Sequence, residues 1–482
     1  MKRHSEPPLW LAVMPVATLI CAMITLIAVK GAFAVQEIGQ WLLLGAGLLT
    51  AVLATTLGRR HPSSLLSGLR EAGAQILPSI PILLLIGAVS ATWMLSGVVP
   101  LLIDYGLEII SPDMFLFIAC AVSALISVLT GSSWTTIATI GVAFMGIGTV
   151  MGYSAGWIAG AIISGAYFGD KISPLSDTTV LASSACGVNL FAHIRNMMAT
   201  TVPSIAIALI VFIIAGFATQ HSEVMSDNEL QSRLGETFNL TPWLLVVPAA
   251  TALLIARRLN SYITLSMSAV IGLAAMYIFQ PEVIAQLAGQ AADAGVFDTA
   301  WTGLRSAFTS TSLSTGSDLL DSLVETGGIE GMLPTVYLVS CAAIFGGTMI
   351  GSGMLSAITA ALHRKIRSRR ASVTATVATG ITMNGCTGDQ FLSIILTSNI
   401  YKSMYSHNGQ SPLLLSRTVE DSVSVTSVLI PWNSCGLTQS AVLGVPTLAY
   451  LPYCIFNLLS PLTTLAVSWA AARIRKFRLA GV

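Results

Sequence analysis

Long apolar segments recur along this chain from Leu9 to Ala471, and short polar interruptions separate them. Leu9 to Val29, Trp41 to Leu57 and Pro78 to Val99 each approach or reach the roughly 20 apolar residues that a helix needs to cross a bilayer. We count roughly ten to twelve such spans, some of them broken. Because backbone groups in lipid must be satisfied inside the protein, the pattern predicts an all-α polytopic membrane protein in a lipid bilayer.

One interruption is too polar to be a lipid-facing helix. The stretch from Gly165 to Leu181 contains the carboxylates of Asp170 and Asp177 within apolar surroundings. A charge at membrane depth costs from about 3 to over 10 kcal/mol, and it persists where it faces water, an ion or a partner. The Ser173-Pro174 pair predicts a break in the helix, which frees backbone groups for partners inside the protein. We therefore expect a functional site on broken backbone here.

The chain also shows signs of an internal repeat. Ser96-Gly97 and Ser352-Gly353 lie 256 residues apart (352 − 96), and two Thr-Gly pairs, at 130 and 387, lie 257 apart (387 − 130). Between these motifs the first half carries an acidic loop, whereas the second half carries a basic one. Because basic loops favour the cytoplasm, the opposite signs predict two halves inserted upside down relative to each other. Such inverted repeats are typical of transporters.

These patterns predict the organisation of the chain. We expect residues 1–8 to be a cytoplasmic N-terminus, residues 9–217 and 241–472 to form the two transmembrane repeats, residues 218–240 to be an external linker, and residues 473–482 to be a basic cytoplasmic tail. The first apolar run resembles a signal sequence but is too long for the apolar region of one, so we expect it to be retained as a transmembrane helix.

Basic residues beside the apolar segments predict the topology of the loops. Arg59 and Arg70 fall in a loop after the second apolar segment, and His193 and Arg195 mark a later turn. Cytoplasmic loops carry an excess of Lys and Arg, so both loops are expected inside the cell.

Oxygen-bearing side chains gather at the polar centre of each half. A hard monovalent cation such as Na⁺ prefers several oxygens from carboxylates, hydroxyls, amides or backbone carbonyls. The expected ion-binding residues are Asp170, Asp177, Thr178, Ser132, Ser133, Thr135, Asp389, Asp421 and Asn433. Na⁺ itself is expected at Asp177, Ser133 and Asp389. A desolvated carboxylate can hold either a proton or the ion, so competition for one carboxylate is the simplest antiport mechanism.

Four charged residues near these segments have a structural interpretation. Lys171 and Arg417 are expected to form buried bridges with Asp170 and Glu420. Asp421, next to Glu420, is expected to be the counterpart of Asp177 in the second half. Which carboxylate contacts the ion directly stays open at this point.

Composition and motifs exclude several other classes of protein. Charged residues make up 9% of the chain, against roughly 25% in a soluble domain, and the net charge is +1, so no nucleic-acid partner is expected. The cysteines do not have the spacing of a zinc site, so no cofactor is expected. An intramembrane serine hydrolase, with Ser132 or Ser133 beside His193, is a remote alternative, because no GxSxG elbow is present and the paired carboxylates would have no role. An enzyme is therefore not expected.

Several motifs resemble those of the NhaC-type sodium/proton antiporter family. They are TGSSWTTIATIGVAFMGIG from Thr130, GAYFGDKISPLSDTTVLAS from Gly165, HIRNM from His193, TGDQ from Thr387, and SRTVED with LIPWNSCG between Ser416 and Gly436. The resemblance covers most of the chain. It implies a secondary transporter of a bacterial inner membrane that exchanges Na⁺ for H⁺. The family also includes exchangers of organic acids such as malate and lactate, so an exchanger of organic acids or amino acids is an alternative. A homodimer is left open.

The chain departs from this family in its second half. Thr397-Ser398-Asn399 stands where Pro-Gly-Arg is usual, which removes a basic group. Ser422-Val423-Ser424 stands where Ser-Gly-Thr is usual, and a proline is replaced at Val428. Without that glycine and proline, we expect a less distorted helix here. These departures affect what the resemblance implies about the ion ligands of the second half and the transported solute. They do not affect the first half.

Overall fold

The computed structural model describes residues 7–31, 34–219, 227–257, 259–289, 296–316, 318–363 and 368–479. Helices form almost all of this part of the chain, and its only β-pairing is an isolated bridge between Thr311 and Thr326. Eight of the described helices are long and apolar enough to cross a membrane, and a ninth span is bent. The protein is therefore an all-α, multi-pass membrane protein, as the apolar pattern predicted.

The helices of the first half begin with α1, which matches the first predicted span closely. They are α1 (Leu9–Lys30), α2 (Ala34–Thr56), α3 (Pro62–Ile76), α4 (Ser79–Leu95), α5 (Val98–Ile109), α6 (Phe115–Thr130), α7 (Ser133–Thr136), α8 (Val142–Val150), α9 (Ala155–Ile172), α10 (Asp177–Cys186), α11 (Leu190–Ala218) and α12 (Asp227–Thr237). A π-helical turn, Ile137–Gly141, joins α7 to α8.

The second half is built in a similar way. Its helices are α13 (Val246–Ala256), α14 (Ser261–Phe279), α15 (Pro281–Leu287), α16 (Val296–Ser306), α17 (Asp318–Val324), α18 (Leu333–Gly351), α19 (Met354–His363), α20 (Arg369–Thr387), α21 (Gln390–His407), α22 (Pro412–Val419), α23 (Ser434–Leu443), α24 (Thr447–Tyr450) and α25 (Ile455–Leu479).

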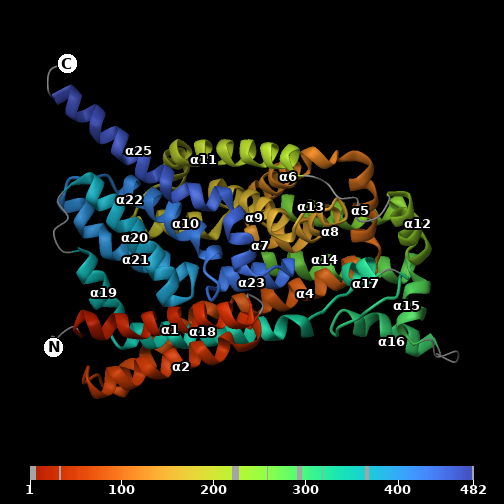
Figure 1. Ribbon diagram of the computed structural model, residues 1–482, viewed down its shortest axis with the longest axis horizontal. Helices are drawn as coiled ribbons and strands as arrows, with labels where there is room; N and C mark the ends of the chain where they lie inside the picture. The colour runs from red at the N-terminus through yellow and green to blue at the C-terminus, as the bar shows by residue number, and fades with distance from the viewer. Residues whose placement is uncertain are drawn as a thin grey trace.

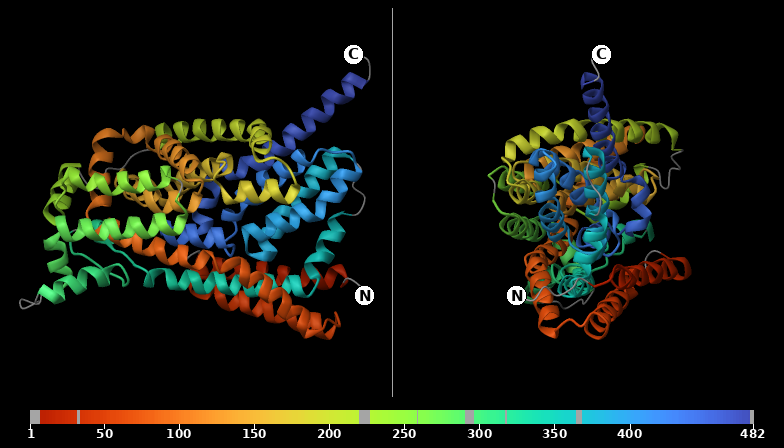
Figure 2. Two further views of the ribbon diagram at one scale, coloured as in Figure 1. Left: turned by 180° about the vertical axis from the view of Figure 1, so that it is seen from behind. Right: turned by 90° about the vertical axis from the view of Figure 1, so that its left-hand side faces the viewer.

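The bundle is elongated, with its long helices running roughly along the long axis (Figure 1). α1, α2 and α18 lie side by side along one edge, and α11 runs along the opposite edge against α6 and α25 (Figures 1 and 2). The start of α1 and the end of α25 lie at the same end of the long axis (Figure 1). The short, broken helices α7, α10 and α23 lie between the two edges.

Glycines with positive φ end equivalent helices in the two halves. Gly97 (φ 81°) and Gly353 (φ 72°) follow α4 and α18, and Gly131 (φ 67°) and Gly388 (φ 68°) follow α6 and α20. A left-handed backbone is costly for residues other than glycine, so each of these positions ends a helix at a defined residue. The two sequence motifs that indicated a repeat are therefore also two equivalent pairs of helix ends.

The predicted loop around Arg70 is wrong. Residues Pro62–Ile76 form α3. Leu65, Ala72 and Ile76 lie on its buried side, and this helix packs against α18. Polar residues between these apolar ones disguise the helical spacing, because only one narrow face is buried. Arg70 therefore lies on a helix that continues into α4 after a short turn.

The expectation of a less distorted helix after Glu420 is also wrong. Residues Glu420–Ser424 form a π-helical turn, and Ser427–Leu429 form a 3₁₀ turn. The chain then leaves the helical region until α23 begins. Distortion here does not require the glycine or proline, because buried side-chain donors satisfy the freed carbonyls: Asn384 donates to the carbonyl of Val423, and Asn457 to that of Val425.

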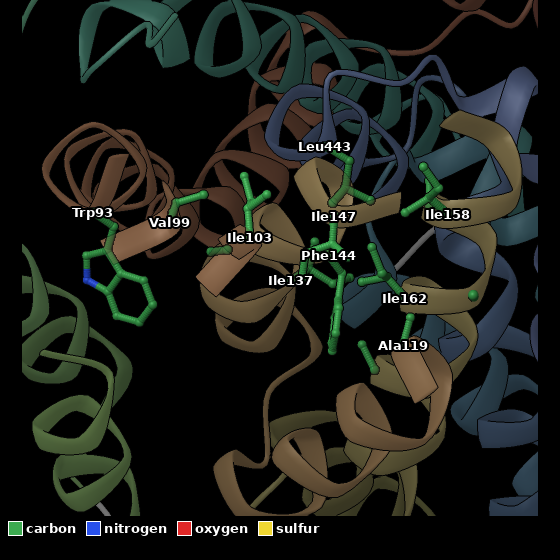
Figure 3. Close-up of a cluster of buried hydrophobic side chains, with 14 of the residues drawn as sticks. Trp93, Val99, Ile103, Ala119, Ile137, Phe144, Ile147, Ile158, Ile162 and Leu443 are labelled. Atoms are coloured by element: carbon green, nitrogen blue, oxygen red, sulfur yellow. The ribbon is translucent and has the colours of Figure 1, made fainter. Parts of the chain in front are cut away.

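Apolar packing of α8 against its neighbours holds the first half together. Figure 3 shows Phe144 and Ile147 of α8 among side chains from surrounding helices, including Ile103 of α5, Ala119 of α6 and Ile162 of α9. All five side chains are at most 4% exposed. This packing fixes α9, and with it the carboxylate of Asp170 near its C-terminal end.

Glycines bring α9 into backbone contact with α6. A Cβ atom at Gly165 would lie 2.0 Å from the carbonyl oxygen of Cys120, and one at Gly169 would lie 2.4 Å from that of Ala124. Neither position has room for a side chain, so this close approach depends on glycine. It places the last turn of α9 directly beside the end of α6.

We expect Gly165→Ala to lower the melting temperature of the purified protein, because α6 and α9 must separate to admit the methyl group. The cost should be about 1–3 kcal/mol. Gly73→Ala is the matched control, since a Cβ atom there meets nothing within 4 Å. That substitution should be neutral or stabilise by about 0.4–1 kcal/mol. Equal melting temperatures for the two variants would contradict the packing described.

Candidate functional site

The first break in the helical bundle follows α6. Gly131 ends that helix, and Ser132 caps α7 by accepting a hydrogen bond from the amide of Thr135 at 3.2 Å. Ser133, the first residue of α7, donates to Asp170 from both its amide, at 3.2 Å, and its hydroxyl, at 2.7 Å. The positive end of α7 and two donors thus stabilise a buried carboxylate.

The second break separates α9 from α10. Ser173 leaves the helical region and donates its hydroxyl to the carbonyl of Val128 at 2.8 Å. Ser176 then caps α10, and Asp177 is the first residue of that helix. Asp177 is exposed, whereas Asp170 is only 9% exposed. The predicted break at Ser173-Pro174 is confirmed, and it places a second carboxylate beside the first.

Two adjoining cavities meet at these breaks. The inner cavity, of about 70 Å³, is lined by Ser79, Ile82, Gly131, Ser132, Trp134, Thr135, Asp170, Asp177, Thr178, Ser261, Gln390 and Phe391. The outer cavity, of about 560 Å³, shares eight of these residues and extends to Gln75, Pro78, Thr130, Leu175, Leu181, Ile255, Leu259, Asn260, Tyr262, Thr264 and Ile395. No Lys, Arg or His occurs among the described residues that line either cavity.

The structure brings only some of the predicted ion-binding residues together. Asp170, Asp177, Thr178, Ser132 and Thr135 line the inner cavity. Ser133 is 2% exposed and reaches the site through Asp170, to which it is hydrogen-bonded. The remaining three predicted residues, Asp389, Asp421 and Asn433, line neither cavity.

Asp389 and Asn433 cap helices at the breaks of the second half. Asp389 accepts a hydrogen bond from the amide of Leu392 at 2.8 Å and one from the hydroxyl of Ser434 at 3.3 Å. Asn433 caps α23 through the amide of Cys435 at 3.1 Å. The caps of these breaks tie α21 and α23 to each other.

A shift of 257 residues relates the breaks of the two halves. It carries Ser132 onto Asp389 (389 − 132) and Asp177 onto Ser434 (434 − 177), and the members of each pair lie at equivalent helix starts. The serine and the aspartate therefore exchange places between the halves. In the second half they bond each other, whereas in the first half both line the cavity. Ser434, not Asp421, is the structural counterpart of Asp177.

Asp421 forms an ion pair that was not predicted. The Lys171 ammonium group contacts the Asp421 carboxylate, and the two side chains are 1% and 0% exposed. Thr464 of α25 donates to the same carboxylate at 2.5 Å, and Lys171 donates to Ser460 at 2.9 Å. The expected pairing of Lys171 with Asp170 is wrong. The observed pair joins α9 of the first half to the π-helical turn Glu420–Ser424 of the second, and the hydrogen bonds of the two side chains reach α25.

Glu420 and Arg417 lie beside this pair. Thr178 donates to Glu420 at 3.1 Å, so Glu420 lies one hydrogen bond behind the inner cavity. The Arg417 guanidinium lies 4.0 Å from Asp421, and no ion pair between Arg417 and Glu420 occurs in the part of the chain that the structure describes. Lys171 and Arg417 were expected to pair with Asp170 and Glu420. Both basic side chains instead face Asp421, the residue next to Glu420.

His193 is not a loop residue, contrary to the prediction. It lies in the first turn of α11, is fully buried, and shares a hydrogen bond of 2.9 Å with Ser416 of α22. Arg195 is exposed. Ser132 bonds Thr135 and Ser133 bonds Asp170, so neither hydroxyl is hydrogen-bonded to His193 as the remote hydrolase alternative requires.

Sequence reasoning missed the wall of the cavities that faces the breaks. Ser79 and Ile82 come from α4, and Ser261 and Tyr262 from the start of α14. Gln390, which also lines the inner cavity, adjoins Asp389 within the TGDQ motif and so had a local signal. The other four carry none, because folding alone brings α4 and α14 to the breaks.

The oxygen atoms at the cavity suit an alkali cation better than a resident transition metal. No cluster of three or more His, Cys, Asp or Glu side chains suited to a metal ion occurs in the described residues. The inner cavity instead mixes two carboxylates with the hydroxyls of Ser132, Thr135 and Thr178. Hard cations favour such oxygen sets.

Comparison with known proteins shows which family shares these motifs. The chain matches the Na⁺/H⁺ antiporter family over residues 8–184 and 165–471. It is 36% identical over 414 residues to the Na⁺/H⁺ antiporter NhaC of Alkalihalophilus pseudofirmus, covering 86% of each chain. It is 35% identical over 381 residues to the malate-2H⁺/Na⁺-lactate antiporter of Bacillus subtilis, covering 78% of each. It is also 31% identical over 463 residues to the arginine/ornithine antiporter ArcD of Halobacterium salinarum, covering 95% of this chain and 91% of that one.

We expect Lys171→Met to destabilise the purified protein by about 3–5 kcal/mol, because it leaves the Asp421 carboxylate buried without its main cation. The double variant Lys171→Met/Asp421→Asn should regain part of this loss, since both charges are then absent. Lys402→Met, which removes an exposed lysine, is the control and should change stability little. Thermal unfolding of these three variants and of the single variant Asp421→Asn measures the effect. If the double variant is as unstable as the sum of the two single variants, the pair does not act as one unit.

Proposed function

Because the chain belongs to the Na⁺/H⁺ antiporter family, we propose that it exchanges Na⁺ for H⁺ across a membrane by alternating access. One structural observation carries this proposal: two carboxylates, Asp170 and Asp177, share a cavity with hydroxyl groups at two broken helices. Broken helices at a buried site are the usual ion-binding elements of secondary transporters. Na⁺ and H⁺ are then the transported ions, and the proposal requires no cofactor.

The inner cavity is the proposed Na⁺ site. Its volume of about 70 Å³ holds an ion with at most a water or two, given roughly 30 Å³ per water. Asp177 supplies an exposed carboxylate, and Thr178, Ser132 and Thr135 supply hydroxyl oxygens. Asp170 supplies the second carboxylate, which Ser133 holds in place.

Competition between a proton and Na⁺ for these carboxylates supplies the exchange. A protonated Asp177 presents no negative charge to an incoming ion, and a bound Na⁺ prevents protonation of the same oxygen. Asp170 stays oriented in either state, because the amide and hydroxyl of Ser133 both reach one of its oxygens. Each face of the membrane would thus load the site with either a proton or Na⁺.

Exchange of an organic acid is the second candidate, because one relative is named for malate and lactate. A carboxylate ligand needs a cation or a helix N-terminus at its binding site. The described lining of both cavities contains neither Lys nor Arg nor His. The helix starts at the site already face carboxylates, because Asp170 bonds the start of α7 and Asp177 is the first residue of α10. This charge balance favours a cation over an organic anion. It also favours transport over catalysis, so we propose that the protein is not an enzyme.

We further propose a bacterial inner-membrane location with both termini in the cytoplasm. The described ends of the chain lie at one end of the long axis (Figure 1). Arg60 lies between the apolar spans Glu37–Thr56 and Pro62–Leu95, as a cytoplasmic residue would. We also propose that the two halves are inverted repeats. The glycines paired at their helix ends support the repeat, and the opposite signs of their loop charges support the inversion.

Proteoliposomes with an imposed proton gradient test the proposed exchange. Adding Na⁺ to the wild type should dissipate the gradient, as an internal pH dye reports. Asp177→Asn and Asp170→Asn should each lower the rate by about 100-fold or more, because the site loses charge that the ion needs. Glu108→Gln, which removes an exposed carboxylate at the end of α5, should keep the wild-type rate.

Two outcomes would count against this assignment. If Na⁺ alone has no effect but Na⁺ with malate or lactate does, the protein exchanges organic acids. If Asp177→Asn and Asp170→Asn keep the wild-type rate, the ion site lies elsewhere in the bundle.

A further inference from the structure

The outer cavity is much larger than a Na⁺ site requires. Its volume of about 560 Å³ is eight times that of the inner cavity (560/70). Pockets for small organic ligands measure roughly 300–1,000 Å³. The outer cavity therefore has the size of an organic ligand site, and it adjoins the proposed ion site.

The outer cavity combines one carboxylate with aromatic and aliphatic walls. Asp177 lies where the two cavities meet, because it lines both. Phe391 and Tyr262 contribute aromatic rings, and Leu181 and Ile395 are among the aliphatic residues. Tyr262 donates its hydroxyl to the carbonyl of Pro78 at 2.7 Å, which holds that ring at the wall.

From this lining we propose that the outer cavity binds small organic cations of the alkylammonium class, quaternary ammonium included. The cationic group would lie at Asp177, and its methyl groups would lie against Phe391 and Tyr262. Aromatic faces attract quaternary ammonium groups, and burial of the methyl groups against the apolar wall is favourable. The proposal rests on the proposed function, because such a cation would compete with Na⁺ for Asp177.

Other classes of ligand suit this lining less well. An organic acid or a zwitterion would bring a carboxylate into a cavity whose described lining offers no basic side chain, and an unpaired charge is costly when desolvated. A neutral alcohol of the same shape would leave the carboxylate of Asp177 without a counter-charge. Charge and shape together therefore select a cation.

Three compounds that share one trimethyl head group test the charge requirement. Choline carries a quaternary nitrogen, 3,3-dimethylbutan-1-ol replaces that nitrogen with carbon, and glycine betaine adds a carboxylate. Radioactive Na⁺ uptake into proteoliposomes is measured with each of them. At a choline concentration about four times its dissociation constant, the half-saturating Na⁺ concentration should rise about fivefold without a change in the maximal rate, as simple competition for Asp177 gives. The other two compounds should have little effect.

Variants of the outer wall test the location. Leu181→Trp fills the cavity and should abolish the effect of choline while Na⁺ uptake stays within about twofold of wild type, because the substitution leaves the inner cavity unchanged. Leu181→Met is the matched control and should keep the choline effect. Phe391→Leu retains apolar volume but removes a ring, so it should weaken the choline effect even if the tryptophan variant does not fold.

Three results would overturn the inference. Choline could leave Na⁺ uptake unchanged, the neutral alcohol could act as strongly as choline, or Leu181→Trp and Phe391→Leu could both keep the full effect. Titration calorimetry of choline with detergent-purified protein needs no transport, so it still tests the outer cavity if the wild type proves unable to exchange Na⁺ for H⁺. No binding heat in that experiment would also refute the proposal.

Discussion

The structure depends on satisfying the backbone groups that are exposed where helices break inside the bundle. A break in an apolar environment leaves amides and carbonyls that must find partners within the protein. Side chains at the helix starts meet this need, among them Ser132, Ser176, Asp389 and Asn433. Because the caps are polar and the breaks lie inside the bundle, the same requirement that stabilises the fold also gathers oxygen atoms into one buried region.

Two neighbouring residues of α9 connect this region to the rest of the bundle in different ways. Asp170 faces the first break and the cavity, whereas Lys171 points to the second half and pairs with Asp421. A buried ion pair contributes modestly to net stability but strongly penalises the loss of either partner. The pair therefore ties the two halves at the level of the cavity. It leaves Asp170 and Asp177 as the carboxylates at the cavity.

The two halves use similar breaks for different purposes. In the second half the aspartate and serine at equivalent positions bond each other, which closes that break. In the first half the aspartate is exposed, and it lies between a small polar cavity and a large mixed one. An exchange of two residue types between equivalent positions thus distinguishes a structural junction from the candidate binding site.

The sequence by itself determined the class of the protein, both glycine-ended breaks and the break within Gly165 to Leu181, because apolar length, glycine, proline and buried charge act locally along a chain. It could not identify α3, whose buried face is narrow, or the buried position of His193. Only the tertiary structure decided that Asp421 pairs with Lys171, that Asp389 bonds Ser434, and that α4 and α14 complete the cavity wall. These features depend on which helices come into contact, and no local pattern encodes the distance between residues that lie hundreds of positions apart.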